Sequence, residues 1–118
     1  MKPYQTKRSR GYSKYHNNRV LTPYGVFDSG KEYQRFMVLL SWERCGKITD
    51  LRRQVWFDLL PSQKTSWGYE RPVKYKADFV YSKNGKMVVE DVKGYKTPDY
   101  IIKRKLMLYI HGIEIREV

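Results

Sequence analysis

The sequence predicts an α/β fold in which a four-stranded mixed sheet is flanked by two helices, in the order α, β, β, β, α, β. Three observations predict it. A capped helical segment begins at Ser29, two alternating segments flank Asn84-Gly85, and a second capped segment begins at Thr97. The 118 residues, 41% hydrophobic and 31% charged, fit one soluble globular domain.

The first helix is expected from Ser29 to about Cys45. Ser29 and Glu32 have the spacing of a capping box, in which the serine oxygen accepts from the third helical N–H and the glutamate reaches back. Gly46 lies just past the end, where a left-handed residue often stops a helix. The apolar stripe is expected to consist of Tyr33, Phe36, Met37 and Leu40.

Three strands are expected next, over residues 48–60, 73–81 and about 86–93. The first is rich in β-branched and aromatic residues, and the second alternates between apolar and polar residues. Asn84-Gly85 favours a tight hairpin turn because both residues tolerate positive φ. Residues 61–71 contain Ser, Gly, Pro and Lys, and are expected to form a loop.

The second helix is expected to begin at Thr97-Pro98-Asp99, since Thr caps, Pro suits the first position and Asp favours the positive end of the helix dipole. His111-Gly112 closes it, and residues 113–118 alternate as a short last strand. Its apolar stripe is expected to consist of Ile102, Leu106, Tyr109 and Ile110.

Residues 1–19 are expected to form a basic arm with interleaved aromatic residues, and residues 20–118 the folded domain. The arm has no acid and few aliphatic residues. One interpretation is that the arm neutralises DNA phosphates, and the other is a solubilising tail. Its candidate nucleic-acid-binding residues are Lys7, Arg8, Arg10 and Lys14.

The charge balance narrows the class of partner. Lys and Arg number 24 against 12 acids, a net charge of +12, which favours nucleic acid as the partner. The longest apolar run, residues 36–40, is too short to span a bilayer, so no membrane partner is expected. The single cysteine, Cys45, excludes an intrachain disulfide and a cysteine-rich zinc site, and an intracellular location is expected.

The acids of the hairpin are the candidate catalytic groups. Asp91 and Lys93 share a strand face, and Asp78 on the preceding strand has the opposite parity to Tyr75. We therefore expect a polar site face set against an apolar core face. Two neighbouring carboxylates repel each other unless a cation lies between them, and oxygen ligands suit Mg²⁺ or Mn²⁺. Lys93 would orient the attacking water or stabilise charge on the phosphate.

Several of these residues have alternative interpretations. Asp78 and Asp91 would otherwise be solvated strand residues that balance lysines across the hairpin. Glu32 is either a third ligand or only the cap of its helix, and Glu90 should point away from the site unless a bulge intervenes. Gln54 either lines the site or is an exposed polar residue of its strand. Lys103 and Lys105 either contact a DNA phosphate or lay their alkyl chains along the apolar face with the ammonium group in solvent. Trp56 and Trp67 could stack on bases, although core packing or loop anchoring is favoured.

Asp78, followed thirteen residues later by Asp91-Val92-Lys93, resembles the PD-(D/E)XK motif of restriction-endonuclease-like nucleases, whose core is αβββαβ. Ala77 stands where the motif has proline. More narrowly, the chain resembles a family of small phage and prophage proteins labelled as a domain of unknown function within that superfamily. The resembling stretches are Lys14-Tyr15-His16-Asn17, residues 26–32, residues 50–54, Tyr75-Lys76-Ala77-Asp78-Phe79, residues 89–94 and residues 100–103.

The resemblance implies roles for particular residues. Asp78 and Asp91 would be metal ligands, Lys93 the catalytic lysine and Glu32 the acid of the first helix. The expected function is a Mg²⁺- or Mn²⁺-dependent DNA endonuclease of phage type inside a bacterial host. Its substrates would include branched or recombination-intermediate DNA, as for a Holliday junction resolvase, and symmetrical cutting would require a homodimer. The alternatives are a non-catalytic nucleic-acid-binding protein and, less favoured, an RNA-binding protein of ribosomal type.

Overall fold

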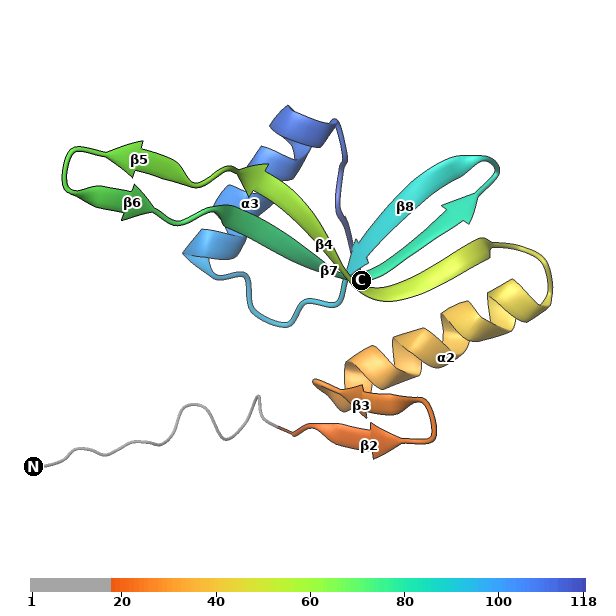
Figure 1. Ribbon diagram of the computed structural model, residues 1–118. Helices are drawn as coiled ribbons and strands as arrows, with labels where there is room; N and C mark the ends of the chain where they lie inside the picture. The colour runs from red at the N-terminus through yellow and green to blue at the C-terminus, as the bar shows by residue number, and fades with distance from the viewer. Residues whose placement is uncertain (1–17) are drawn as a thin grey trace, which may run out of the picture. The chain divides into compact units, whose positions relative to one another are not determined.

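The computed structural model describes residues 18–118, so that of the expected arm only Asn18 and Arg19 are included. Lys7, Arg8, Arg10 and Lys14 lie outside the described residues. The elements in chain order (Figure 1) are β2 (Val20–Thr22), β3 (Gly25–Phe27), α2 (Gly30–Arg44), β4 (Thr49–Leu60), β5 (Gln63–Thr65), β6 (Gly68–Glu70), β7 (Val73–Lys83), β8 (Lys86–Asp91), α3 (Pro98–His111) and β9 (Arg116–Glu117).

The chain divides into two compact units, with the boundary between Val38 and Leu39 inside α2. In the first unit, β2 and β3 form an antiparallel hairpin that the sequence analysis did not predict. Phe27 is fully buried, and its ring centroid lies 5.2 Å from that of Phe36 on α2. This aromatic contact packs the hairpin against the start of the helix.

Helix α2 begins and ends as predicted. The Ser29 hydroxyl oxygen accepts a hydrogen bond from the Glu32 N–H at 3.1 Å, which is the first half of the capping box. Gly46, just beyond the end, has a φ of 78°. The expected apolar stripe is only partly correct, because Met37 is 37% exposed whereas Leu39 is fully buried.

The second unit contains the predicted four-stranded mixed sheet, in the order β4-β7-β8-β9. The β4–β7 and β7–β8 pairs are antiparallel, and β8–β9 is parallel. Asn84 and Gly85 both have positive φ at the β7–β8 turn, which confirms the predicted hairpin. The last strand is shorter than expected, because only Arg116 and Glu117 pair with β8.

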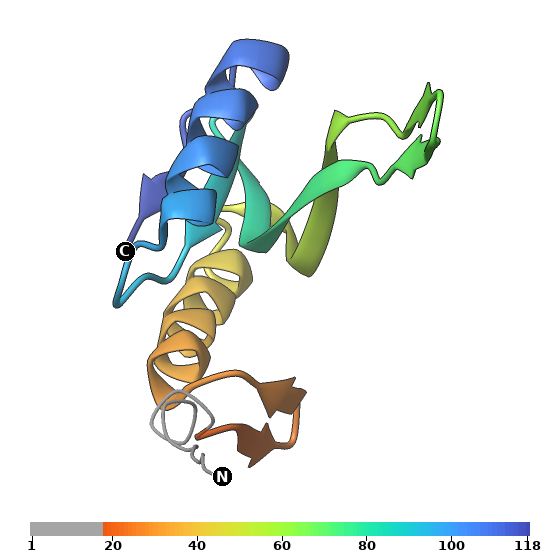
Figure 2. The same ribbon diagram turned by 90° about the vertical axis from the view of Figure 1, so that its left-hand side faces the viewer.

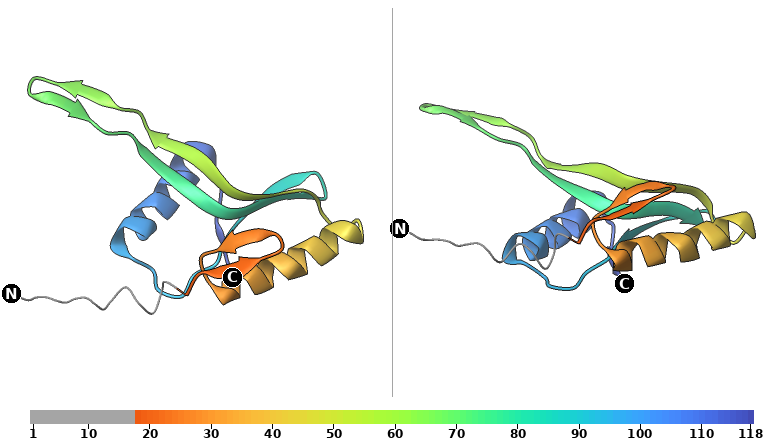
Figure 3. Two further views of the ribbon diagram at one scale, coloured as in Figure 1. Left: turned by 60° about the horizontal axis from the view of Figure 1, so that its bottom comes forward. Right: turned by 90° about the horizontal axis from the view of Figure 1, so that it is seen from below.

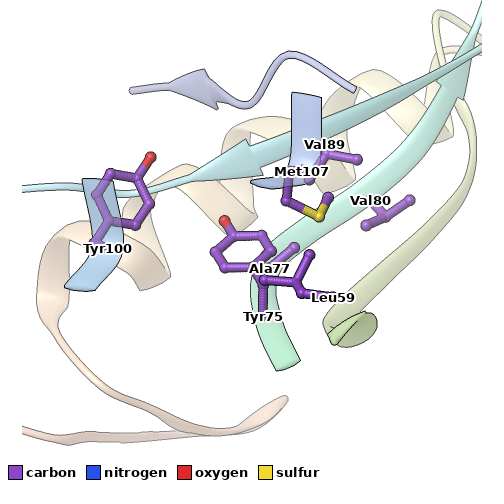
Figure 4. Packing of buried hydrophobic residues seen from close by; sticks show 7 residues of the cluster. All are labelled: Leu59, Tyr75, Ala77, Val80, Val89, Tyr100 and Met107. Atoms are coloured by element: carbon purple, nitrogen blue, oxygen red, sulfur yellow. The ribbon is translucent and has the colours of Figure 1, made fainter. Parts of the chain in front are cut away.

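Helix α3 lies along one face of this sheet and contacts β4 and β7 (Figure 2). The Thr97 hydroxyl caps it by accepting from the Tyr100 N–H at 3.2 Å, and Gly112 ends it in the left-handed conformation. The predicted stripe is only partly correct, because Leu106 packs against the core whereas Ile102 is 58% and Tyr109 87% exposed. The buried cluster between helix and sheet (Figure 4) consists of Leu59, Tyr75, Ala77, Val80, Val89, Tyr100 and Met107.

Residues 61–71 are not the predicted loop. They contain the antiparallel strands β5 and β6, which extend the paired β4 and β7 into a longer two-stranded ribbon (Figure 3). The Thr65 hydroxyl donates to the Gly68 carbonyl at 2.9 Å and so closes the turn. Within residues 18–118, neither helix is long and apolar enough to cross a lipid bilayer.

Candidate functional site

Asp78 and Asp91 lie opposite each other where the β7–β8 ladder ends. The last pair of that ladder is Phe79 with Glu90, so the same antiparallel register places Asp78 across from Asp91. Beyond this point the ladder is replaced by a side-chain contact, in which Asp78 Oδ2 accepts from the Val92 N–H at 2.8 Å. Directly opposite residues of antiparallel strands have Cβ atoms about 5 Å apart, so the two carboxylates are neighbours.

The carboxylate of Asp91 is buried and held from two sides. Asp91 is 3% exposed, and the Tyr75 hydroxyl donates a hydrogen bond to its Oδ2 atom. The Lys93 Nζ atom lies 3.3 Å from Asp91 Oδ1. This ion pair confirms the prediction that Asp91 and Lys93 share one face.

The alternation of β7 predicted a separate polar face for the site. The structure instead places the site against the core. Tyr75, which holds Asp91, belongs to the buried cluster under α3, and so does Val80. Strict alternation would separate Tyr75 from Val80, so β7 changes face between them. Gln54 lies opposite Asp78 in the β4–β7 register, and its φ of 54° is a left-handed value in mid-strand. This left-handed residue thus lies beside the stretch of β7 in which the face changes.

Lys93 is fixed by an aromatic ring as well as by Asp91. Its side chain is 25% exposed, and its Nζ atom lies 4.1 Å from the centroid of the Tyr100 ring. The Tyr100 hydroxyl in turn donates to Glu117 Oε2 at 2.7 Å. Glu117 is also paired with Lys96 and Arg104, each at 3.0 Å. A continuous set of contacts thus connects the ammonium group to the last strand.

Four polar residues form a row across the sheet. Asp91 on β8 pairs with Glu117 on β9. Extending the adjacent β7–β8 and β4–β7 pairs by one position places Asp78 across from Asp91 and Gln54 across from Asp78. The row brings Gln54, a predicted nucleic-acid-binding residue, to the strand position next to Asp78. Glu117 was not singled out from the sequence.

The protonation of the two tyrosines follows from their surroundings. Burial, then the hydrogen bond to Asp91 and the negative charges of Asp91 and Asp78, raise the pKa of Tyr75 far above its usual value. Burial and the hydrogen bond to Glu117 raise the pKa of Tyr100 in the same way. Both hydroxyls therefore remain protonated donors, and both aspartates act on the same Tyr75 hydroxyl.

Glu117 is held in its charged form. The hydrogen bond from Tyr100, followed by those from Lys96 and Arg104, lowers the pKa of Glu117 from 4.5 to about 2. At neutral pH the ring that covers Lys93 is thus anchored on a carboxylate. Glu117 therefore positions Tyr100, whose ring lies against the Lys93 ammonium group.

The donor set fits Mg²⁺ or Mn²⁺ through two carboxylates. Magnesium is commonly bound by one or two protein carboxylates, with water and substrate phosphates as the other ligands. Asp78 and Asp91 provide such a pair, and each carboxylate oxygen has two lone pairs, so the contacts to Tyr75 and Val92 leave acceptor capacity. Among residues 18–118, no group of three or more histidine, cysteine or acidic side chains is arranged to hold a metal ion.

Glu32 and Glu90 were the two ambiguous acids. Glu32 is 3% exposed at the start of α2 in the first unit, where its N–H is capped by Ser29, and its role as a third ligand stays a prediction. Glu90 is fully buried and accepts a hydrogen bond from the Tyr81 hydroxyl. It lies opposite Phe79, outside the cluster under α3, which agrees with its predicted orientation away from Asp91.

The helix lysines differ in exposure. Lys103 is half-buried on α3, whereas Lys105 is exposed and lines a shallow pocket together with Arg104 and Glu117. A phosphate contact by either lysine stays a prediction. Trp56 and Trp67 are exposed, at 60% and 72%, so the expectation of core packing is wrong for both.

Sequence reasoning missed Tyr75, Tyr100 and Glu117. Alternation assigned Tyr75 to the core, which is correct, but gave no sign that its hydroxyl reaches Asp91. An acid on a short last strand beside the expected site was the available signal for Glu117. Its position next to Asp91 depends on the parallel pairing of β9 with β8.

A family model described as a protein of unknown function (DUF1064) matches residues 12–116 of the chain. The match covers most of the sequence, and the chain belongs to this family. No curated protein matches the sequence significantly.

Proposed function

We propose that this member of the DUF1064 family is a Mg²⁺- or Mn²⁺-dependent endonuclease that hydrolyses phosphodiester bonds in DNA. The observation that carries the proposal is the cross-strand pair Asp78–Asp91, with the Lys93 ammonium 3.3 Å from Asp91. The element order of α2, β4, β7, β8, α3 and β9 supports it, since it is the order expected of a restriction-endonuclease-like core. The net charge of +12 supports a polyanionic substrate.

Asp78 and Asp91 would hold the cation, with water and substrate phosphate oxygens as its other ligands. When bound, the cation would acidify a water molecule and stabilise negative charge on the scissile phosphate. Tyr75 fixes the orientation of the Asp91 carboxylate through its hydrogen bond. A ligand held in this way has less freedom to lose when it binds.

Lys93 would act on the water or on the phosphate. Its ammonium lies between the Asp91 carboxylate and the Tyr100 ring, at 3.3 Å and 4.1 Å respectively. Three N–H donors are available on an ammonium group, so the contact with Asp91 leaves donors for a water molecule or a phosphate oxygen. Gln54, next to Asp78 in the polar row, would contact the DNA backbone.

The resemblance to phage and prophage proteins suggests branched or recombination-intermediate DNA as the substrate. One site cuts one strand, so a symmetrical cut of a four-way junction would need two copies of the chain. A bacterial cytoplasm is the location that follows from this proposal.

A non-catalytic nucleic-acid-binding protein is the second candidate. It is favoured by the structural contacts that both aspartates already make, because Asp78 accepts from the Val92 N–H and Asp91 from the Tyr75 hydroxyl. In that case the carboxylates would hold the end of the β7–β8 ladder, and the basic surface alone would bind DNA.

Cleavage assays distinguish the two candidates. The protein is incubated with linear, flapped and four-way-junction DNA, with Mg²⁺, with Mn²⁺ and with EDTA. Asp91→Asn is compared with Glu90→Gln, a neighbouring buried acid that bonds to Tyr81. We expect metal-dependent cleavage by the wild type and by Glu90→Gln, and none by Asp91→Asn.

Circular dichroism verifies that each variant is folded, and Lys93→Met provides a second inactive variant whose substitution leaves both aspartates in place. DNA binding without cleavage of any substrate, with either metal, would establish the non-catalytic candidate. Cleavage by Asp91→Asn at the wild-type rate would remove Asp91 from the site.

A further inference from the structure

The two-stranded ribbon formed by residues 56–76 starts in the sheet beside helix α3, and its outer end, the β5–β6 hairpin, projects away from the helix (Figures 2 and 3). It contains the far ends of β4 and β7 and the β5–β6 hairpin. Its tip is ordered by the Thr65 side chain, which accepts from the Trp67 N–H at 3.2 Å and donates to the Gly68 carbonyl. We refer to residues 56–76 as the ribbon.

Three large aromatic side chains on the ribbon are exposed. Trp56, Trp67 and Tyr69 are 60%, 72% and 71% exposed, respectively. None of them belongs to the buried cluster under α3. Tryptophan is highly buried on average in folded proteins, so two exposed tryptophans on one projecting element require an explanation beyond packing.

Lysines accompany these rings. Lys64 pairs with Tyr69 in the β5–β6 register, and Lys76 pairs with Trp56 in the β4–β7 register. The Lys76 Nζ atom lies 5.3 Å from the Trp56 ring centroid. The ribbon contains four cationic residues against two acids. Each exposed strand ring therefore has an ammonium group beside it.

An aromatic ring with an adjacent cation suits a nucleotide, because the ring can stack on the base while the cation contacts the phosphate. A protein partner is less well matched, since lysine is depleted at the cores of protein interfaces. A base must be unpaired or at a branch to expose its face to such a ring. The charge and the rings together thus favour single-stranded over duplex DNA.

We propose that the ribbon is a stacking platform for unpaired DNA bases, with Trp67 and Tyr69 stacking on bases and Lys64 and Lys76 contacting phosphates. The choice of DNA rests on the proposed function, but the platform itself requires no cleavage and no metal. It would direct the nuclease to DNA that contains unpaired bases.

The test measures DNA binding in EDTA, where metal-dependent cleavage does not occur. Fluorescence anisotropy gives the dissociation constants of the full-length protein for a labelled 20-nucleotide single strand and for the duplex of the same sequence, at one fixed salt concentration. Trp67→Ala and Tyr69→Ala are compared with Tyr109→Ala, whose ring is 87% exposed on α3. All three residues are exposed, so all three variants should fold.

We expect Trp67→Ala to weaken single-strand binding about tenfold, the loss of one stacked base, and to change duplex binding less than about twofold. Tyr109→Ala should bind both DNAs like the wild type. Unchanged single-strand binding by Trp67→Ala and Tyr69→Ala would overturn the platform and leave a protein partner as the occupant of the ribbon. An equal loss on single strand and duplex would also overturn it, and tighter binding of the same sequence as RNA would overturn the choice of DNA.

This binding experiment and the cleavage assay can refute the two proposals independently of each other. A protein that cleaves nothing, but whose Trp67→Ala variant loses single-strand binding, retains the platform and loses the nuclease proposal. A protein that cleaves DNA with Mg²⁺, while Trp67→Ala binds like the wild type, retains the nuclease proposal and loses the platform.

Discussion

The Tyr75 hydroxyl is the group whose removal tests the candidate site with the least change in packing. Tyr75→Phe keeps the ring in the buried cluster and deletes only the donor to Asp91. Tyr75 is 4% and Asp91 3% exposed, so water does not readily replace the lost donor. Hydrogen bonds to charged groups contribute about 1.5–3 kcal/mol, so the free energy of unfolding should fall by about 2 kcal/mol. For a domain of this size that is roughly 8 °C in Tm.

Urea denaturation followed by circular dichroism measures this loss, and Tyr81→Phe is the matched control. Tyr81 is also buried and donates to a buried acid, but that acid is Glu90. Both variants should lose similar stability. Only Tyr75→Phe should slow DNA cleavage, because only Tyr75 contacts a proposed metal ligand.

Two results would refute this reasoning. A change of less than about 0.5 kcal/mol in Tyr75→Phe would mean that the hydroxyl does not hold Asp91 in solution. Equal loss of cleavage in Tyr75→Phe and Tyr81→Phe would mean that activity follows overall stability and not the geometry of Asp91.

Three further predictions concern stability. Because Tyr100 and its neighbours hold the pKa of Glu117 near 2, below its usual 4.5, the charged carboxylate stabilises the fold above pH 4.5 and loses this effect as the pH falls towards 2. Glu117→Gln should therefore be about 1–2 kcal/mol less stable than the wild type at pH 7 and equally stable near pH 2 in urea titrations; an undiminished gap at low pH would contradict this. Thr97→Ala, which removes the cap of α3, should cost about 1 kcal/mol in thermal denaturation, and an unchanged Tm would contradict the capping contact. Asp78→Ala should be about 1–2 kcal/mol less stable than Asp78→Asn, because only asparagine keeps an acceptor for the Val92 N–H; equal unfolding midpoints would contradict that contact.

The sequence predicted those features whose physical cause lies within a few residues. Thr97 caps the helix that follows it, Asn84-Gly85 forms the turn between β7 and β8, and Gly46 lies just past the end of α2 in a left-handed conformation. Each depends on local backbone preferences and short-range hydrogen bonds. Tertiary contacts were not needed to predict them.

The buried face of α3 could not be predicted in this way. The apolar spacing of Ile102, Leu106 and Tyr109 is helical, yet the helix buries Tyr100 and Met107. Tyr100 is fixed on that side by its hydrogen bond to Glu117, which belongs to another element. Periodicity alone therefore identified the helix but not the side of it that faces the sheet.

The candidate site shows the same division. Alternation on one strand correctly placed Lys93 beside Asp91. The expectation of a separate polar face was wrong, because β7 changes face near Asp78, opposite the left-handed Gln54. Glu117 reaches the row only through the parallel pairing of β9 with β8. Such non-local pairing has no signature in a single sequence.

The central claim is that Asp78 and Asp91 bind one divalent cation between them. Electron paramagnetic resonance of Mn²⁺ tests it most directly, with an uncleavable DNA duplex present to provide phosphate oxygens. Wild type and Glu90→Gln should each bind Mn²⁺ at this site, whereas Asp78→Asn and Asp91→Asn should each bind it at least about tenfold more weakly. Equal Mn²⁺ affinity in all four folded proteins would contradict the claim.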